Sequence, residues 1–154
     1  MQPRDIQDKS LPAPSELGFY AVEDQVGFLM RRANQRHTAI FADGMAAMDL
    51  TPTQFTALVK VTELGRVTQN HLGRLAAMDP ATIQGVVRRL MDRDLVVRTA
   101  DPLDRRAMVL EPTQAGLSLV AKAVVAARRI TEATLEPLTG DERHQFLALL
   151  RKLC

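Results

Sequence analysis

The segment 79–116 constrains the fold of this chain more than any other. Asp79 is followed by a proline, a combination typical of the start of a helix. Beyond it, Ile83, Val87 and Leu90 recur at i, i+4 and i+7, the spacing of one apolar helix face. The pattern predicts an amphipathic helix that buries this face and leaves the opposite one in solvent.

Two short strands are predicted directly after that helix. Residues 95–99 are rich in β-branched side chains, residues 100–104 have turn chemistry, and residues 106–110 form the returning strand. Thr113 then caps a further helix. A hairpin this short, placed between two helices, indicates a thin finger that projects from a helical body.

The other parts of the chain are predicted to be helical. Capping residues and apolar spacing place helices at about 22–48, from Thr51 to Gly65, after Thr68, at about 114–136, and from Thr139 to about 152. The predicted fold class is mainly α with a small β-hairpin. It is a winged helix-turn-helix with N- and C-terminal dimerisation helices.

Four regions are expected along the chain. They are a flexible N-terminal arm at 1–17, a dimerisation helix with ligand-pocket residues at 18–50, the winged helix-turn-helix lobe at 51–112, and C-terminal dimerisation helices at 113–154.

Composition is that of an ordinary globular protein. The 154 residues are 46% hydrophobic and 25% charged, with a net charge of +2, which permits a nucleic-acid partner without requiring one. Cys154 is the single cysteine, so an intrachain disulfide is impossible. Because neither a signal peptide nor a membrane-length apolar run is visible, a cytoplasmic protein is expected.

No catalytic constellation is visible in the sequence. His37, His71 and His144 are scattered without metal-ligand spacing, and there is no glycine-rich phosphate loop or nucleophile elbow. An enzyme is therefore not expected, and no cofactor or metal is predicted.

The solvent face of the helix after Asp79 has the composition of a DNA-reading surface. Gln84 can pair with adenine and Arg88 with guanine in the major groove. Arg89 and Arg93 are placed for phosphates. The face consists of Ala81, Gln84, Gly85 and Arg88, with Thr82 and Arg89 at its edges. The alternative is a solvated helix face that happens to hold two arginines.

The hairpin tip carries two further arginines, Arg105 and Arg106. A guanidinium on a thin finger can enter the minor groove, where the negative potential favours it. Phosphates would repel Asp104, so its expected role is to orient Arg106 by a charge-assisted hydrogen bond. The alternative is a surface turn with incidental ion pairs.

The tip also carries a resemblance to a known family. Asp104, Arg105 and Arg106, followed by Val109, Thr113 and Gly116, resemble the wing signature of the MarR family of transcriptional regulators. The resemblance implies a dimer that binds a palindromic operator, usually as a repressor released by a small ligand. It also implies that Arg106 is the minor-groove arginine, that Asp104 is its orienting partner, and that Thr82, Gln84 and Arg88 are base-reading candidates.

Three positions depart from the family pattern. Asp94 replaces a glycine before the wing, Pro112 replaces a leucine before Thr113, and Gly73 stands where alanine is usual. The first two are expected to change the angle of the wing.

Dimerisation is predicted from the apolar surface of the terminal helices, although an intrachain bundle could use the same residues. Those expected to interlock with a partner are Leu117, Val120, Val124, Leu135, Leu138, Phe146, Leu147, Leu149, Leu150 and Leu153.

The segment 27–41 is unusual for a purely structural helix, and it is similar to the first helix of MarR-type regulators of aromatic-compound breakdown. A small aromatic carboxylate or phenol is the implied effector. Phe28 and Phe41 could form its apolar wall, Arg31 or Arg32 could clamp a carboxylate, and His37 could donate a hydrogen bond. The alternative is that the arginines are solvated and the histidine is structural.

Two other functions stay open from the sequence alone. The winged fold could serve as a protein-interaction module without DNA, or Cys154 could make the chain a redox-sensing regulator. A single-strand or RNA binder is disfavoured, because aromatic residues make up 4% of the chain and stacking platforms are scarce.

Overall fold

A computed structural model describes residues 20–104 and 106–154. The arm predicted at 1–17 and the tip residue Arg105 lie outside the described residues. The chain divides into two compact units, one ending at Asn34 and the other spanning Gln35–Cys154, and each is described by itself.

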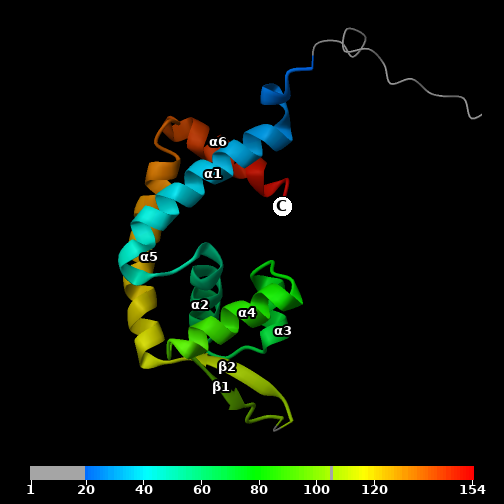
Figure 1. Ribbon diagram of the computed structural model, residues 1–154, viewed down its shortest axis with the longest axis vertical. Helices are drawn as coiled ribbons and strands as arrows, with labels where there is room; N and C mark the ends of the chain where they lie inside the picture. The colour runs from blue at the N-terminus through cyan, green and yellow to red at the C-terminus, as the bar shows by residue number, and fades with distance from the viewer. Residues whose placement is uncertain (1–19, 105) are drawn as a thin grey trace, which may run out of the picture. The chain divides into compact units, whose positions relative to one another are not determined.

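The described elements are helices and one hairpin, as predicted (Figure 1). In chain order they are the 3-10 helix η2 (Val22–Asp24), α1 (Val26–Met45), the 3-10 helix η3 (Ala46–Met48), α2 (Pro52–Leu64), α3 (Gln69–Leu75), α4 (Pro80–Asp92), β1 (Val96–Ala100), β2 (Met108–Pro112), α5 (Gln114–Thr134) and α6 (Gly140–Arg151).

The predicted helix starts are confirmed by their capping geometry. Thr51 and Gln54 form a reciprocal capping box at the start of α2, and Thr139 and Glu142 form another at the start of α6. Asp79 accepts hydrogen bonds at the start of α4. These local side-chain bonds satisfy amide groups that have no partner inside the helix.

The helix predicted at 22–48 is interrupted at both ends. Gln25 has an extended backbone, with ψ 140°, which separates η2 from α1. At the other end α1 tightens into η3, and Asp49 ends the run in the left-handed region, with φ 48°. The chain then turns back toward α2, so Met48 is followed by an irregular link at 49–51.

The hairpin is displaced along the chain by one to two residues from its prediction. Its strands are antiparallel, with Val96 opposite Pro112 and Ala100 opposite Met108. The tip is larger than expected because the Asp101 amide donates to the Ala107 carbonyl, and the Ala107 amide donates to the Asp104 carbonyl. Figure 1 shows the far end of the sheet projecting beyond α2, α3 and α4.

Two apolar clusters form the core of the second unit. One lies in the lobe built from α2, α3, α4 and the hairpin, and it includes Leu58, Leu72 and Leu90, each with no exposed surface. The other joins the end of α1 to α5 through residues such as Phe41 and Ile130. Helix α5 contributes to both clusters, so it links the lobe to the end of α1.

The predicted dimer surface is only partly available. Val120 and Leu135 are 8% exposed and belong to the core of the single chain, which corrects their assignment to a partner contact. By contrast, Phe146, Leu149 and Leu153 are 41%, 59% and 71% exposed.

The start of α5 is fixed against the junction between α4 and β1. The Thr113 hydroxyl donates to the Asp94 carbonyl, 2.6 Å away, and accepts from the Gly116 amide. A Cβ atom added at Gly116 would lie 2.1 Å from the carbonyl oxygen of Leu95, which no rotamer change can relieve. Only glycine allows α5 to approach this close.

We therefore expect Gly116→Ala to destabilise the fold by about 1–3 kcal/mol, because the helix must move away from the strand junction. Denaturant unfolding monitored by circular dichroism measures the change. Gly140→Ala is the matched control, since an added Cβ there meets nothing within 4 Å. Equal midpoints for the two variants would contradict this account of the junction.

Candidate nucleic-acid interface

The first turn of α4 is held by its capping carboxylate. Asp79 accepts hydrogen bonds from the amides of Ala81 and Thr82 at 3.0 and 2.9 Å, and it also accepts one from the Thr82 hydroxyl. The bonds from Thr82 are the main reason that the pKa of Asp79 is lowered. The carboxylate is therefore ionised at neutral pH, where it complements the positive end of the helix.

Capping also limits the hydrogen bonds that the Thr82 hydroxyl can make with an external partner. Its hydroxyl proton is directed to Asp79, so toward an external partner its oxygen is a hydrogen-bond acceptor. In a major groove that favours the amino groups of cytosine or adenine over the carbonyl oxygens of guanine and thymine and the ring nitrogens of the purines.

The two faces of α4 are separated by burial as the sequence predicted. Ile83, Val87 and Leu90 are at most 2% exposed, and Val86, which the sequence analysis did not assign to the core, is buried beside them. The opposite side is open to solvent. It presents Ala81, Thr82, Gln84, Arg88 and Arg89 as exposed residues and Gly85 as a half-exposed one.

At the hairpin tip, Asp104 acts on the backbone. Its carboxylate accepts from the amide of Arg106 at 3.0 Å, and Leu103 donates in the same way to Asp101 at 2.9 Å. The predicted pairing between Asp104 and the Arg106 guanidinium is not among the hydrogen bonds of the described residues. The carboxylate shapes the turn from which the exposed Arg106 side chain projects.

Three contacts that the sequence analysis missed fasten the hairpin to the lobe. Arg66 forms an ion pair with Glu111, and the guanidinium of Arg98 donates to the Gln69 side chain at 2.7 Å. Val67 also pairs with Leu110 as an isolated bridge. These partners are up to 45 residues apart in the chain, so no local sequence pattern predicts the contacts.

Arg93 has a different role from the predicted phosphate contact. It is half-buried at the C-terminal cap of α4, and its guanidinium donates to the carbonyl oxygens of Met48 and Asp49. Two of its donors are therefore used within the protein. The sequence analysis missed this partner because it is 44 positions away in the chain, and the phosphate contact of Arg93 stays a prediction.

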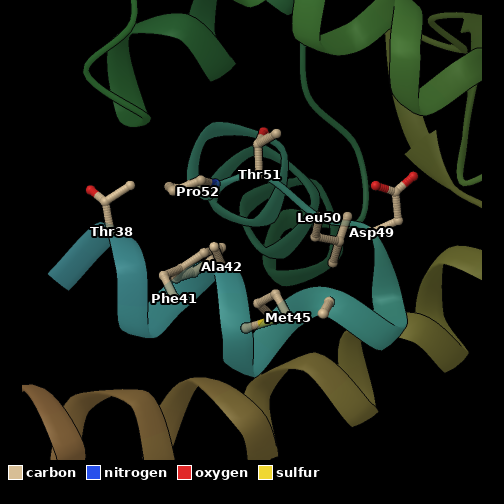
Figure 2. Close-up of a pocket in the computed structure, with 9 residues that line it drawn as sticks. Thr38, Phe41, Ala42, Met45, Asp49, Leu50, Thr51 and Pro52 are labelled. Atoms are coloured by element: carbon tan, nitrogen blue, oxygen red, sulfur yellow. The ribbon is translucent and has the colours of Figure 1, made fainter. Parts of the chain in front are cut away.

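A cavity of about 250 Å³ lies at the end of α1 (Figure 2). Phe41, Ala42 and Met45 of α1 lie on one side of it, with Leu50 and Pro52 on the other. Ala46, Asp49, Thr38 and Thr51 complete the lining. The lining is mostly apolar, with Thr38, Thr51 and Asp49 as its polar members, which suits a small ring compound.

Of the five predicted ligand-binding residues, Phe41 lines this cavity. His37 is engaged within the chain: its Nδ1 lies 2.9 Å from the Thr134 hydroxyl, whose own proton goes to the Ile130 carbonyl. Nδ1 of His37 is therefore a donor to Thr134, and only its other ring nitrogen is available to a ligand.

The remaining three residues belong to the first unit. There the Arg31 guanidinium lies 5.2 Å from the centre of the Phe28 ring, a cation–π contact, and Arg32 is exposed. Their role as a carboxylate clamp stays a prediction.

The described residues show neither a metal centre nor a membrane span. No group of three or more His, Cys, Asp or Glu residues is arranged to hold a metal ion at 20–104 or 106–154. Within the same ranges, no helix is both long and apolar enough to cross a bilayer.

Comparison with known proteins decides the family. The chain is 41% identical over 141 residues to the HTH-type transcriptional repressor NicR of Pseudomonas putida, covering 92% of this chain and 89% of that protein. Residues 48–107 match the model of the MarR family. The chain belongs to the MarR family of transcriptional regulators.

Two solved structures of similar proteins support the fold as well. A probable transcriptional regulator from Pseudomonas aeruginosa is 46% identical with a TM-score of 0.84, covering 87% of this chain and all of that one. BpsR of Bordetella bronchiseptica, whose DNA binding is regulated by 6-hydroxynicotinic acid, is 38% identical with a TM-score of 0.83. The match covers 88% of this chain and 97% of BpsR.

The departures from the MarR pattern now have structural explanations. Asp94 has φ 54°, a left-handed conformation that favours glycine and that aspartate tolerates better than most residues. Pro112 ends β2, where a missing amide is least costly to the sheet. A Cβ at Gly73 would lie 3.2 Å from Ile83 Cγ2 and 3.3 Å from the Met78 carbonyl, so this chain packs α3 closely on α4.

Gly85 offers a test of the reading face. An added Cβ there meets nothing within 4 Å, so Gly85→Ala should stabilise α4 by about 0.5–1 kcal/mol through its higher helix propensity. On DNA the same methyl group would separate the helix backbone from the groove, and affinity should fall. Thermal unfolding and fluorescence anisotropy with an operator duplex measure the two effects, and a variant that gains both stability and affinity would contradict the assigned face.

Proposed function

We propose that this protein is a dimeric transcriptional repressor that binds a palindromic operator and is released by a small aromatic acid or phenol. The observation that carries the proposal is the exposed face of α4 beside a projecting hairpin with Arg106 at its tip. The name of the NicR relative supports repression, and the effector of BpsR supports the ligand class.

The DNA contacts are assigned by position. Helix α4 enters the major groove, where Gln84 and Arg88 read base edges and Thr82 accepts a hydrogen bond, while Arg89 contacts phosphate. The hairpin enters the minor groove with Arg106. Arg105, which lies outside the described residues, stays a predicted DNA contact. Asp104 contributes by fixing the turn that carries Arg106.

The dimer is assigned from apolar surface that the single chain leaves uncovered. On α6, Leu149 is more than half exposed and Phe146 is 41% exposed, and Leu153, two residues beyond the helix, is 71% exposed. Leu117 and Val125 on α5 are similarly open, at 39% and 51%. Two copies that bury these side chains present two α4 helices, which is what a palindromic operator requires.

The effector is assigned to the cavity at the end of α1. A volume of about 250 Å³ lies just below the range of about 300–1,000 Å³ that holds drug-sized ligands, which favours a single substituted ring. Phe41 provides an aromatic wall, held by its edge-on contact with Phe55 at 6.0 Å between ring centres. The first compound to test is 6-hydroxynicotinic acid.

Release requires the effector to prefer a conformation that does not bind DNA. A ligand with equal affinity for both conformations shifts nothing, however tightly it binds. The cavity is bounded by α1 and by the link between α1 and α2, and the ligand is proposed to displace that link.

Arg106→Ala should weaken operator binding by at least about tenfold. The slope of log affinity against log salt concentration should become less steep by about one, because one phosphate contact is lost. The dimer and its unfolding midpoint should be unchanged, because Arg106 is exposed. Anisotropy titrations at several salt concentrations, with sedimentation velocity for the dimer, measure this. Lys122→Ala removes one exposed charge from α5 as the control. If binding is insensitive to salt, the protein-interaction alternative is favoured instead.

Phe41→Leu should weaken effector binding by about 0.5–1.5 kcal/mol, the value of an aromatic pair beyond its buried area. Operator affinity in the absence of effector should stay that of the parent. Calorimetry with 6-hydroxynicotinic acid and an operator gel shift separate the two quantities, and circular dichroism checks that the variant is folded. Cyclohexanecarboxylic acid, with the same charge but no aromatic ring, is the control ligand. If no aromatic acid releases a bound operator, the effector part of the proposal fails while the DNA part stands.

A further inference from the structure

We propose that Arg93 is the positioning residue through which occupation of the cavity moves the recognition helix α4. The inference deepens the proposed function, since it rests on the cavity as the effector site, and it assigns a task to a residue that the DNA interface does not use. It follows from a pair of hydrogen bonds that join the cap of α4 to the wall of the cavity.

The first step is the geometry of these two hydrogen bonds, which we call the tether. Arg93 directly follows the last residue of α4, and its side chain is half-buried. One guanidinium nitrogen donates to the Asp49 carbonyl, and the other donates to the Met48 carbonyl at 2.9 Å. A guanidinium that binds two neighbouring acceptors is fixed in direction as well as in distance.

The second step is the identity of the segment that receives these bonds. Met48 is the last residue of η3, and Asp49 is the left-handed residue that turns the chain toward α2. Ala46, Asp49 and Leu50 all line the cavity. Any ligand that displaces this stretch of backbone therefore displaces the two carbonyl oxygens that hold Arg93.

The third step is that the tether has no parallel in the described part of the chain. Within residues 20–104 and 106–154, no other hydrogen bond links α4 or its cap to the segment 46–52. Apolar side chains of α4 also hold it in the lobe, but those contacts are not directional. Arg93 consequently transmits a shift of the wall to α4 and, through the apolar core that holds α4 in place, to the lobe that carries it.

Arg143 provides a matched control for the chemistry. It too directs its guanidinium to backbone carbonyls, with Nε 2.8 Å from the Leu138 oxygen and Nη2 3.5 Å from that of Glu136. Neither Leu138 nor Glu136 lines the cavity at the end of α1. Replacing either arginine by glutamine thus removes a carbonyl clamp, but only one of the two clamps joins the cavity to α4.

The experiment measures coupling rather than affinity alone. For the parent, Arg93→Gln, Arg93→Lys and Arg143→Gln, operator affinity is measured with and without saturating 6-hydroxynicotinic acid, and effector affinity is measured without DNA. We expect the parent and Arg143→Gln to lose at least about tenfold in operator affinity when effector is present. Arg93→Gln should bind the effector as the parent does but lose less than about threefold, with Arg93→Lys intermediate because a lysine donates from a single point. Parental coupling in Arg93→Gln would overturn the proposal.

A second arm works without any ligand. Ala42 lines the cavity, so Ala42→Leu fills part of it. Ala39, on the same helix, does not line the cavity and gives the control Ala39→Leu. Ala42→Leu should weaken operator binding in the parent but have little further effect when combined with Arg93→Gln. Additive effects of the two substitutions would overturn the tether, because independent sites add. If 6-hydroxynicotinic acid releases no operator but the effects of Ala42→Leu and Arg93→Gln are not additive, the effector class is wrong and the role of Arg93 stands.

Discussion

Burial of one side of α4 is the constraint on which the DNA-reading surface depends. Ile83, Val86, Val87 and Leu90 are each at most 2% exposed, and they lock the rotation of the helix about its axis. A rotation by one residue, about 100°, would expose this apolar stripe and drive the charged Arg88 toward the core. The side chains that we propose to face DNA are therefore determined by those that face inward.

Much of this could be predicted from the sequence because it is local. A cap such as Thr51 with Gln54, or Asp79 before its proline, is encoded within four residues, and the helix starts were confirmed on that basis. The apolar spacing of α4 can also be recognised locally, because its residues recur within one or two helical turns. The displaced hairpin shows the limit, since the hydrogen bond across the tip from Asp101 to Ala107 lies where β1 ends and β2 begins, and no local pattern predicts it.

The parts of the site that sequence analysis missed are contacts between distant residues. Arg93 resembled a phosphate ligand because its position after α4 is near the DNA-reading face, yet its partners are Met48 and Asp49. Arg66 and Arg98 likewise have partners 45 and 29 residues away that fasten the hairpin. An arginine in a basic segment can serve DNA or a backbone carbonyl, and only the folded chain separates the two roles.

The division of the core into two clusters explains where a regulatory ligand can act. Helix α5 joins the clusters as one continuous helix, with Val120 in one and Ala123 and Ile130 in the other. The second connection is the stretch 46–51, made of a short 3-10 helix, the left-handed Asp49 and a capping threonine. Few helical hydrogen bonds hold this stretch, so it deforms at lower cost than α5. We propose that a small molecule in the cavity beside it bends this softer connection while α5 keeps the lobe attached, so that the lobe turns relative to the end of α1 without unfolding.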